Sequence, residues 1–512
     1  LFDAHKRETR RAAMSYLVMM HVGFVFLLVG FVTLQARGLS VSFEALGAYF
    51  SLYAPLPLFL LFLVGFGMKA GLFPLHSWLP EAHPAAPAHI SAFMSGVMIK
   101  MGIYGILRVV SFMQTDLLWA GVILLVLGIV TAVWGVLFAA VQNDMKRMLA
   151  WSSIENVGVI FIAVGVALIG RATHSTMLTL CAMGGALLHT FNHSMFKTLL
   201  FFGTGNVYTA THTTSLDELG GVAKKMPVTA ALFLVGVLAI CALPPLSGFV
   251  SEFLIYYGLM DTVAAGGGGI MISLAGLLAL SFTGGVAIVA FTKLYGMVFL
   301  GVPRSGAVAS AREVDVVRVV ASAIPLAGIL LVGLAPMLVM RTVFTAAGSV
   351  SATGGAEHLH NFVDRDIWMI ACTGGIFIGA TLLIYLLKMW ALRGRTVTAS
   401  PTWGCGYGAP SARMQYTGES YSEGLQSIAP QLSGTADPGS AVGPNEIFPQ
   451  QRRFSVKRSD TVASAFNTWW VELLRQINRR VMAMRTGKVN YYILYALLFL
   501  LLILILSIFS VI

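Results

Sequence analysis

Three titratable side chains recur at helical spacing in the apolar segment LLHTFNHSMFKTLL, namely His189, His193 and Lys197. Residues four apart lie on the same face of an α-helix, so these side chains would form one row. At a rise of about 1.5 Å per residue, the row would extend over roughly 12 Å along the helix axis. Histidine gains and loses a proton near neutral pH, and one or two water molecules can connect neighbouring members. The pattern therefore suits proton transfer.

Three further charged residues, Lys69, Lys100 and Glu252, occur within or beside long apolar segments. A charged side chain at the centre of a bilayer costs at least about 3 kcal/mol, so such residues usually mark a pathway for ions. A lysine removed from water gives up its proton more readily and can exchange protons near neutral pH. We therefore interpret Lys100 as a relay that connects Lys69 with His189 through water.

Each of these residues also has a purely structural explanation. A buried lysine can pair with an acid for structure alone, and Lys69 can extend its ammonium group to the membrane interface. A single buried histidine is as often a hydrogen-bonded core residue as a functional one. His189 and His193 also have the HxxxH spacing of two metal ligands, but no carboxylate lies nearby in the sequence. We expect neither a metal nor a cofactor.

Two apolar segments contain residues that interrupt helices. The interrupting residues are Pro74 and Pro80 in MKAGLFPLHSWLPEAHPAAPAH, and Pro244, Pro245 and Gly248 in ICALPPLSGFVSEFLIYYG. Proline removes a backbone donor, and inside a membrane the freed carbonyls must be satisfied by protein or by water in a cavity. Two interrupted helices in corresponding positions are typical of a transport site between inverted repeats.

The composition indicates an all-α membrane protein that crosses the bilayer many times. Of the 512 residues, 57% are hydrophobic and 11% are charged, whereas a soluble domain has roughly 25% charged residues. The net charge is +11, but the basic residues lie between apolar segments, so no nucleic-acid partner is expected. The four cysteines form no CxxC pair, which argues against an iron–sulfur cluster, a zinc site or a disulfide framework.

Segments of about 20 apolar residues can span a bilayer, and about eleven are predicted. They lie near residues 14–34, 52–80, 88–110, 117–140, 149–170, 177–202, 228–258, 270–300, 318–343, 366–390 and 489–512. Basic loops alternate with poorly basic loops, which predicts that residues 396–488 are cytoplasmic. The charged loop around Asp144 and Lys146 is either solvated or paired with a neighbouring subunit. His76, His83 and His89 flank the first interruption as helix caps, turn residues or part of an access route from the cytoplasm.

Three motifs carry a family resemblance: GMKAGLFPLHSWLPEAHPAAPAHISAFMSGVMIKMGIYGILR, QNDMKRMLAWSSIENVG and LLHTFNHSMFKTLLFFGTGNVY. They resemble the antiporter-like proton-translocating subunits of respiratory complex I, of multisubunit sodium/proton antiporters and of group 4 membrane-bound NiFe hydrogenases. The resemblance covers roughly residues 5–345. The tail PTWGCGYGAPSARMQYTGESYSEGLQ is similar to one branch, the large membrane subunits of hydrogenase-4 and formate hydrogenlyase.

The resemblance implies an inverted-repeat, antiporter-like fold with two discontinuous helices. It implies an ion relay formed by Lys69, Lys100, His189, His193, Lys197 and Glu252, with Glu252 as the terminal exchange group. It also implies a glutamate partner for Lys69 that would precede Leu1, so the chain is interpreted as N-terminally truncated. The expected units are a translocation domain (1–345), a further membrane helix (346–395), an irregular cytoplasmic segment (396–458), an amphipathic helix (459–488) and a membrane anchor (489–512).

The resulting functional hypothesis is a subunit that moves protons or sodium ions in the plasma membrane of a bacterium or archaeon. The redox reaction would occur in partners, namely peripheral NiFe hydrogenase and iron–sulfur subunits together with other membrane subunits. A cation/proton antiporter without a redox partner is the alternative, and a passive scaffold is a third hypothesis. Buried charges argue against the scaffold, because a scaffold gains nothing from them.

Overall fold

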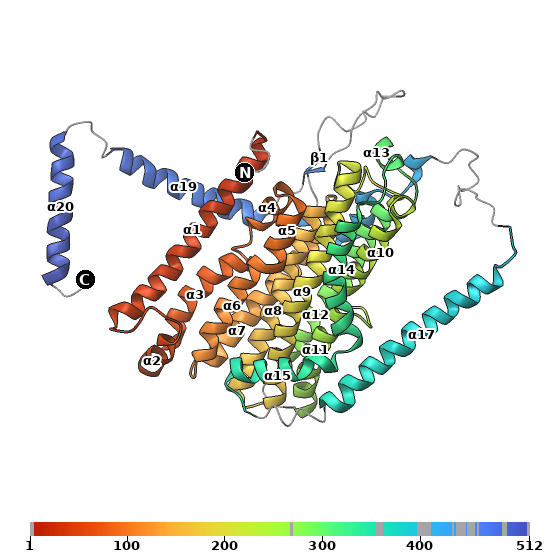
Figure 1. The fold of residues 1–512 in the computed structure, drawn as a ribbon. Helices are drawn as coiled ribbons and strands as arrows, with labels where there is room; N and C mark the ends of the chain where they lie inside the picture. The colour runs from red at the N-terminus through yellow and green to blue at the C-terminus, as the bar shows by residue number, and fades with distance from the viewer. Residues whose placement is uncertain are drawn as a thin grey trace.

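The computed structural model describes residues 5–266, 270–354, 362–396, 411–432, 435–436, 447, 456–457, 460–483 and 489–508 (Figure 1). This part of the chain is almost entirely helical, apart from the antiparallel pair β1 (Thr435–Ala436) and β2 (Val456–Lys457). Seven of its helices are long and apolar enough to cross a membrane, and shorter apolar helices accompany them. The predicted all-α membrane fold is confirmed.

The helices follow one another in a simple order. The first half contains α1 (Arg7–Ala36), α2 (Ala45–Leu52), α3 (Pro55–Ala70), α4 (Leu79–Ala85), α5 (Ala88–Phe93), the π-helix η1 (Met94–Met98), α6 (Ile99–Phe112), α7 (Leu117–Val141), α8 (Met145–Ala172) and α9 (Thr176–Thr211). The second half contains η2 (Val222–Lys224), α10 (Pro227–Ile240), α11 (Ser247–Ala265), α12 (Ile270–Phe299), α13 (Gly306–Ala309), α14 (Val316–Leu334), α15 (Met337–Ser351), η4 (Val363–Ile367), α17 (Trp368–Ala391), η5 (Ala412–Met414), α18 (Gly418–Ile428), η6 (Pro430–Leu432), α19 (Thr461–Ala483) and α20 (Val489–Ile508).

Helix α8 forms the centre of the bundle, and every residue from Met148 to Gly170 is buried. Glycines bring α7 unusually close to it. A Cβ atom on Gly135 of α7 would lie 2.4 Å from the backbone nitrogen of Glu155, and one on Gly158 of α8 would lie 2.3 Å from the nitrogen of Ala132. Small residues at such contacts allow membrane helices to pack backbone to backbone. The polar side chains of α8 are therefore held inside the protein.

The first interruption separates α3 from α4. Helix α3 ends at Gly71, whose φ of +82° is a conformation that glycine adopts without strain. Two hydrogen bonds satisfy backbone groups around the break: the Trp78 indole donates to the carbonyl of Met68 (2.9 Å), and the Phe73 amide donates to the Thr131 hydroxyl (3.1 Å). Protein groups thus replace the hydrogen bonds that the helix loses.

The second interruption separates α10 from α11 and contains Pro244 and Pro245. A Cβ atom on Gly248 would lie 2.0 Å from the carbonyl oxygen of Ala239, so the two half-helices meet where only glycine fits. Helix α14 packs on the same break, because a Cβ atom on Gly333 would lie 2.5 Å from the carbonyl oxygen of Pro245. Both interruptions predicted from the prolines are present.

The structure differs from the predicted elements in two places. The span expected at 318–343 consists of two helices, α14 and α15, which are separated at Ala335 and Pro336. The residue before a proline is disfavoured in the helical conformation, and Ala335 before Pro336 leaves it, with φ −130° and ψ 55°. The earlier Pro325 stays inside α14. The segment expected to be irregular contains helix α18, whose first turn is capped by the Thr417 hydroxyl, which accepts from the Ser420 amide (3.2 Å).

Residues 411–432, here named the docked segment, bind the ends of α7 and α12 at the upper face in Figure 1. Arg304 donates to the carbonyl of Tyr416 (2.6 Å), and the Gly418 amide donates to the carboxylate of Asp217 (2.9 Å). The Asn143 amide group donates to Glu419 (2.8 Å). Helix α18 is therefore fixed to the loops of the bundle by polar contacts.

We expect Gly418→Ala to release the docked segment. The new Cβ atom would lie 2.3 Å from Oδ1 of Asn143, which cannot move freely because Asn143 also binds Glu419 and Lys293. Such overpacking costs about 1–3 kcal/mol, so tryptic cleavage at Arg413 in the solubilised protein should accelerate by about tenfold. Gly424→Ala is the matched control, since nothing lies within 4 Å of that Cβ position on the same helix. Equal cleavage of both variants would contradict the prediction.

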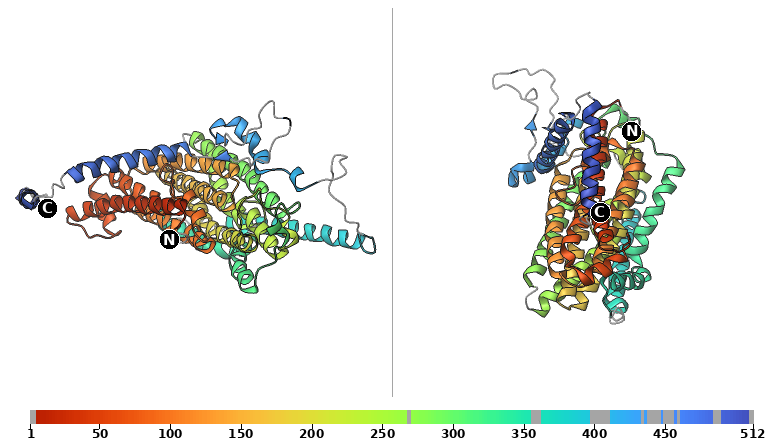
Figure 2. Two further views of the ribbon diagram at one scale, coloured as in Figure 1. Left: turned by 90° about the horizontal axis from the view of Figure 1, so that it is seen from above. Right: turned by 90° about the vertical axis from the view of Figure 1, so that its left-hand side faces the viewer.

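Helices α17, α19 and α20 extend away from the bundle (Figures 1 and 2). Gly374 is the one buried residue of α17, and its Cβ position lies 2.6 Å from the side chain of Pro245 at the second break. The predicted helix at 459–488 corresponds to α19. The side chains of its apolar residues Trp469, Trp470, Leu473 and Leu474 lie outside the described residues. Arg475 and Arg479 pair with Glu472 (3.7 and 2.8 Å).

Candidate ion-translocation site

The predicted row on α9 is buried at the centre of the bundle. His189 is 1% exposed, and His193 and Lys197 are 0% exposed. Helix α9 has 36 residues and packs against α8, α10, α11 and α14. It is not among the seven helices that are long and apolar enough to cross a membrane, in keeping with the polar residues along this face. These groups therefore contact protein, not lipid, and their partners determine what they can do.

Lys197 is held by α8. Its ammonium group donates to the carbonyl of Leu149 (2.9 Å) and to the hydroxyl of Ser152 (2.5 Å). The neighbouring Ser153 donates to the same carbonyl of Leu149 (2.9 Å) and bonds to the hydroxyl of Ser95 (2.8 Å). Hydroxyl groups can both donate and accept hydrogen bonds, so this cluster can pass protons between α8 and its neighbours.

Lys100 is half-buried at the start of α6, directly after the π-helix η1. Its ammonium group bonds to Nδ1 of His193 (2.5 Å) and to the carbonyl of Ser95 in the π-helix. A π-turn disturbs the regular helical hydrogen bonds and leaves carbonyls available to side chains. Ser194 of α9 likewise donates to the carbonyl of Gly96. The π-helix thus brings Lys100 into direct contact with the row.

His189 connects the row to α8 and to the second break. Its Nδ1 bonds to the hydroxyl of Ser251 (3.0 Å), and its Nε2 bonds to Oδ1 of Asn156 (3.1 Å). Asn192 adds two bonds to the start of α11, donating to the carbonyl of Ser247 (2.7 Å) and the hydroxyl of Ser251 (3.1 Å). The row therefore ends beside Glu252, the residue that follows Ser251.

The structure adds one acid that the sequence analysis missed. Glu155 is 4% exposed in the middle of α8, and its Oε2 has no hydrogen-bond partner in the described part of the chain. Lys197 and Glu252 both act on it electrostatically. A carboxylate ten residues inside a long apolar helix is a sequence signal for a buried acid. The motif that contains Glu155 was interpreted only as a family signature.

Lys69 and Glu252 are less well connected than predicted. Lys69 is half-buried near the end of α3, and the structure gives it no hydrogen bond or ion pair with any described residue. Its helix α3 packs closely on α6, which carries Lys100, since a Cβ atom on Gly102 would lie 2.5 Å from the carbonyl oxygen of Phe66. Glu252 is also half-buried, and no direct bond joins it to the row. Lys100 bonds to His193, whereas His189 was the predicted neighbour.

A second fully buried lysine, in addition to Lys197, was not predicted from the sequence. Lys293 of α12 is 0% exposed and donates to the carbonyl of Ala140 (3.1 Å) and to Oδ1 of Asn143 (2.9 Å). These acceptors lie at the end of α7, where a cation interacts favourably with the last carbonyls of a helix. Lys293 therefore stabilises the junction of α7, α12 and the docked segment.

The three histidines near the first break have different environments. His76 is buried and bonds to Asp460 (2.8 Å), which also accepts from the indole of Trp134 (3.3 Å). Asp460 directly precedes α19, so the first break holds the beginning of that helix. His89 is exposed and lines a groove, whereas His83 is fully buried.

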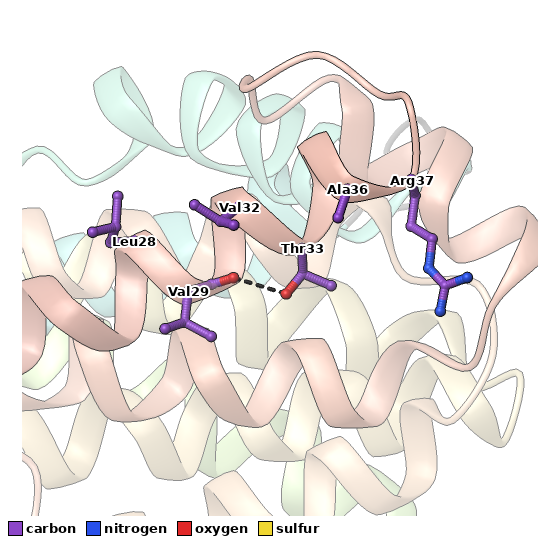
Figure 3. Close-up of a pocket in the computed structure, with 6 residues that line it drawn as sticks. All are labelled: Leu28, Val29, Val32, Thr33, Ala36 and Arg37. Atoms are coloured by element: carbon purple, nitrogen blue, oxygen red, sulfur yellow. Dashed lines mark hydrogen bonds between the residues drawn. The ribbon is translucent and has the colours of Figure 1, made fainter. Parts of the chain in front are cut away.

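Neither of two hollows on the surface of the described residues is lined by the row. An apolar hollow of about 440 Å³ lies on α1 and is lined by residues including Leu28, Val32 and Arg37 (Figure 3). A larger groove of about 1280 Å³, here named the upper groove, is lined by residues from α1, α4, α8, α9 and α14. No group of three or more His, Cys, Asp or Glu side chains in the described ranges could hold a metal ion.

Comparisons with known proteins give a consistent result. Residues 2–280 match the family described as NADH:quinone oxidoreductase/Mrp antiporter, TM. Hydrogenase-4 component B of Escherichia coli K12 is 36% identical over 423 residues, which are 78% of this chain and 62% of that protein. Formate hydrogenlyase subunit 3 of the same strain is 40% identical over 250 residues, which are 48% of this chain and 41% of that protein. This chain therefore spans less than two thirds of either relative.

The fold is similar to that of a solved membrane complex. A chain of the archaeal membrane-bound sulfane sulfur reductase superposes with a TM-score of 0.73 and 22% identity, covering 97% of this chain and 76% of that chain. At this level of identity the likeness concerns the fold alone. It agrees with the antiporter-like arrangement of two discontinuous helices that the sequence predicted.

Proposed function

Because the chain belongs to the NADH:quinone oxidoreductase/Mrp antiporter membrane family, we propose that it moves protons or sodium ions across a membrane as one subunit of a respiratory complex. The relatives hydrogenase-4 component B and formate hydrogenlyase subunit 3 favour a complex of the hydrogenase type. The membrane would be the plasma membrane of a bacterium or archaeon, with residues 396–488 in the cytoplasm.

One observation carries the proposal: a row of titratable side chains is buried at the centre of the helix bundle. Lys100 of α6 bonds to His193 of the row, while the other two members bond to neighbouring helices, Lys197 to α8 and His189 to α11. Buried charges and polar side chains are costly in a membrane protein, and they occur mainly where ions pass. We assign the relay to the predicted residues Lys69, Lys100, His189, His193, Lys197 and Glu252, and we add Glu155.

The redox reaction is assigned to partner subunits. The cysteines of this chain lack the spacing of cluster ligands, so peripheral NiFe hydrogenase and iron–sulfur subunits would carry the electrons. The translocation domain is proposed to comprise residues 1–345. Helices α17, α19 and α20, which leave the bundle, would contact other membrane subunits.

Lys100→Met tests the proposal in the complete complex. In inverted vesicles supplied with the electron donor, electron transfer should continue, while acidification of the vesicle interior should fall at least tenfold because Nδ1 of His193 loses its proton-exchanging partner. Lys224→Met, at the exposed end of η2, is the matched control and should leave acidification unchanged.

Two other outcomes would support different functions. Loss of sodium/proton exchange in vesicles without any electron donor would support an antiporter that works without a redox partner. Unchanged acidification by an assembled Lys100→Met complex would contradict the relay and support a scaffold.

A further inference from the structure

His83 is one of two fully buried histidines near the first break. It lies in α4, is 0% exposed, and neither ring nitrogen has a hydrogen-bond partner among the described residues. A buried polar group left without a partner costs about 1–3 kcal/mol, so its presence calls for an explanation. The ring stacks on Phe201 of α9, with centroids 4.9 Å apart and planes 15° apart.

On one side of His83 lies the upper groove. The three residues that follow His83, namely Pro84, Ala85 and Ala86, line this groove of about 1280 Å³. Lys146 also lines it, and its ammonium group donates to the carbonyl of Ala86 (2.9 Å) and lies 5.5 Å from the ring centre of Tyr208. The groove thus reaches the backbone of α4 directly beside His83.

On the other side of His83 lies the buried row. Phe201, on which the ring stacks, is four residues from Lys197 and therefore on the same face of α9, about 6 Å along its axis. Lys146 is three residues, about 4.5 Å along α8, from Leu149, whose carbonyl binds Lys197. Lys197, Lys146 and Lys100 are the charged groups that act on His83 electrostatically. His83 therefore lies between a groove-lining lysine and the row.

We propose that His83 transfers protons between water in the upper groove and Lys197. One ring nitrogen takes a proton from groove water, and the other gives its proton to the neutral amine of Lys197, which becomes an ammonium group. This transfer leaves the ring in its other neutral tautomer. Rotation of the ring, or exchange of its proton through groove water, restores the starting state, so no other reactant is required. The two ring nitrogens have no partner among the described residues, which leaves one for groove water and the other for Lys197.

His76 provides the contrast on the same interrupted helix. Its Nε2 is bound to Asp460 at 2.8 Å, so one of its two nitrogens is occupied by a structural contact. The inference rests on the proposed function, because it names the access route to the same relay.

The test compares His83→Phe with the wild-type complex in inverted vesicles. Phenylalanine keeps the stack on Phe201 but cannot carry a proton, so a purely packing role would be preserved. We expect normal assembly and electron transfer, with acidification per electron reduced at least tenfold. His83→Gln serves the same purpose with a smaller side chain if the phenylalanine variant does not assemble. His21→Gln, on the exposed side of α1, should behave as wild type.

Lys197→Met, measured in parallel, separates the two proposals. If Lys197→Met abolishes acidification and both His83 variants retain it, the access route is wrong while the relay stands. If Lys197→Met also retains it, the proposed function itself fails. If the His83 variants lose acidification and electron transfer together, the residue has a structural role and the inference is overturned.

Discussion

Replacing Lys197 with methionine is expected to abolish turnover-driven ion movement while the partner subunits continue to transfer electrons. The Lys197 side chain is fully buried, with 0% exposure, and its ammonium group bonds to Leu149 and Ser152. Methionine has a similar length but cannot bind a proton. The acceptor on Leu149 keeps a donor in Ser153, so the fold should survive at a cost of about 1–3 kcal/mol.

The measurement is acidification of inverted vesicles that contain the complete complex, normalised to electron transfer. Lys225→Met is the matched control, because that lysine is exposed after η2 and should leave the ratio unchanged. An assembled Lys197→Met complex that acidifies the vesicles at the wild-type ratio would show that the row on α9 is structural.

Glu155→Gln is expected to reduce acidification per electron transferred at least tenfold. Glutamine has almost the same shape as glutamate, so the close contact between α7 and α8 at Gly135 would be kept. It cannot ionise, and the electrostatic link from Lys197 through Glu155 to Glu252 would be lost. A carboxylate can accept a proton that a neighbouring lysine releases, whereas an amide cannot.

A double-mutant cycle with Glu252→Gln identifies whether the two acids work together. If they act in one path, the double variant should be no worse than the more severe single variant, because groups in one path are not additive. Glu423→Gln, on the exposed side of α18, is the control. Wild-type translocation by Glu155→Gln would remove Glu155 from the path.

Sequence patterns predicted the fold and much of the row for identifiable physical reasons. Apolar segments of sufficient length, prolines at both breaks, and the four-residue spacing of His189, His193 and Lys197 are properties of short stretches of chain. The structure contains the helices, both interruptions and the buried row. The predicted span 318–343 divides at a single proline, Pro336. This division was not predicted, because the residues around Pro336 are as apolar as those of an uninterrupted helix.

The partners of these residues could not be predicted, because they come from distant parts of the chain. The contact of Lys100 with His193 depends on the π-helix before Lys100, and no sequence pattern indicates a π-helix reliably. Glu155 lies on a helix whose burial results from packing against α7 and α9. The hydrogen bond between His76 and Asp460 joins residues that lie 384 positions apart in the sequence. Long-range packing determines all three contacts.

The number of ions moved per electron tests the central claim most directly. The purified complete complex, reconstituted in proteoliposomes, would be compared with the Lys100→Met and Lys197→Met variants by simultaneous recording of electron transfer and of proton and sodium uptake. The account predicts a defined, non-zero ratio for one of the two ions in the wild type and a lower ratio in both variants. An identical ratio in all three complexes would contradict it, because the buried row would then carry no ions.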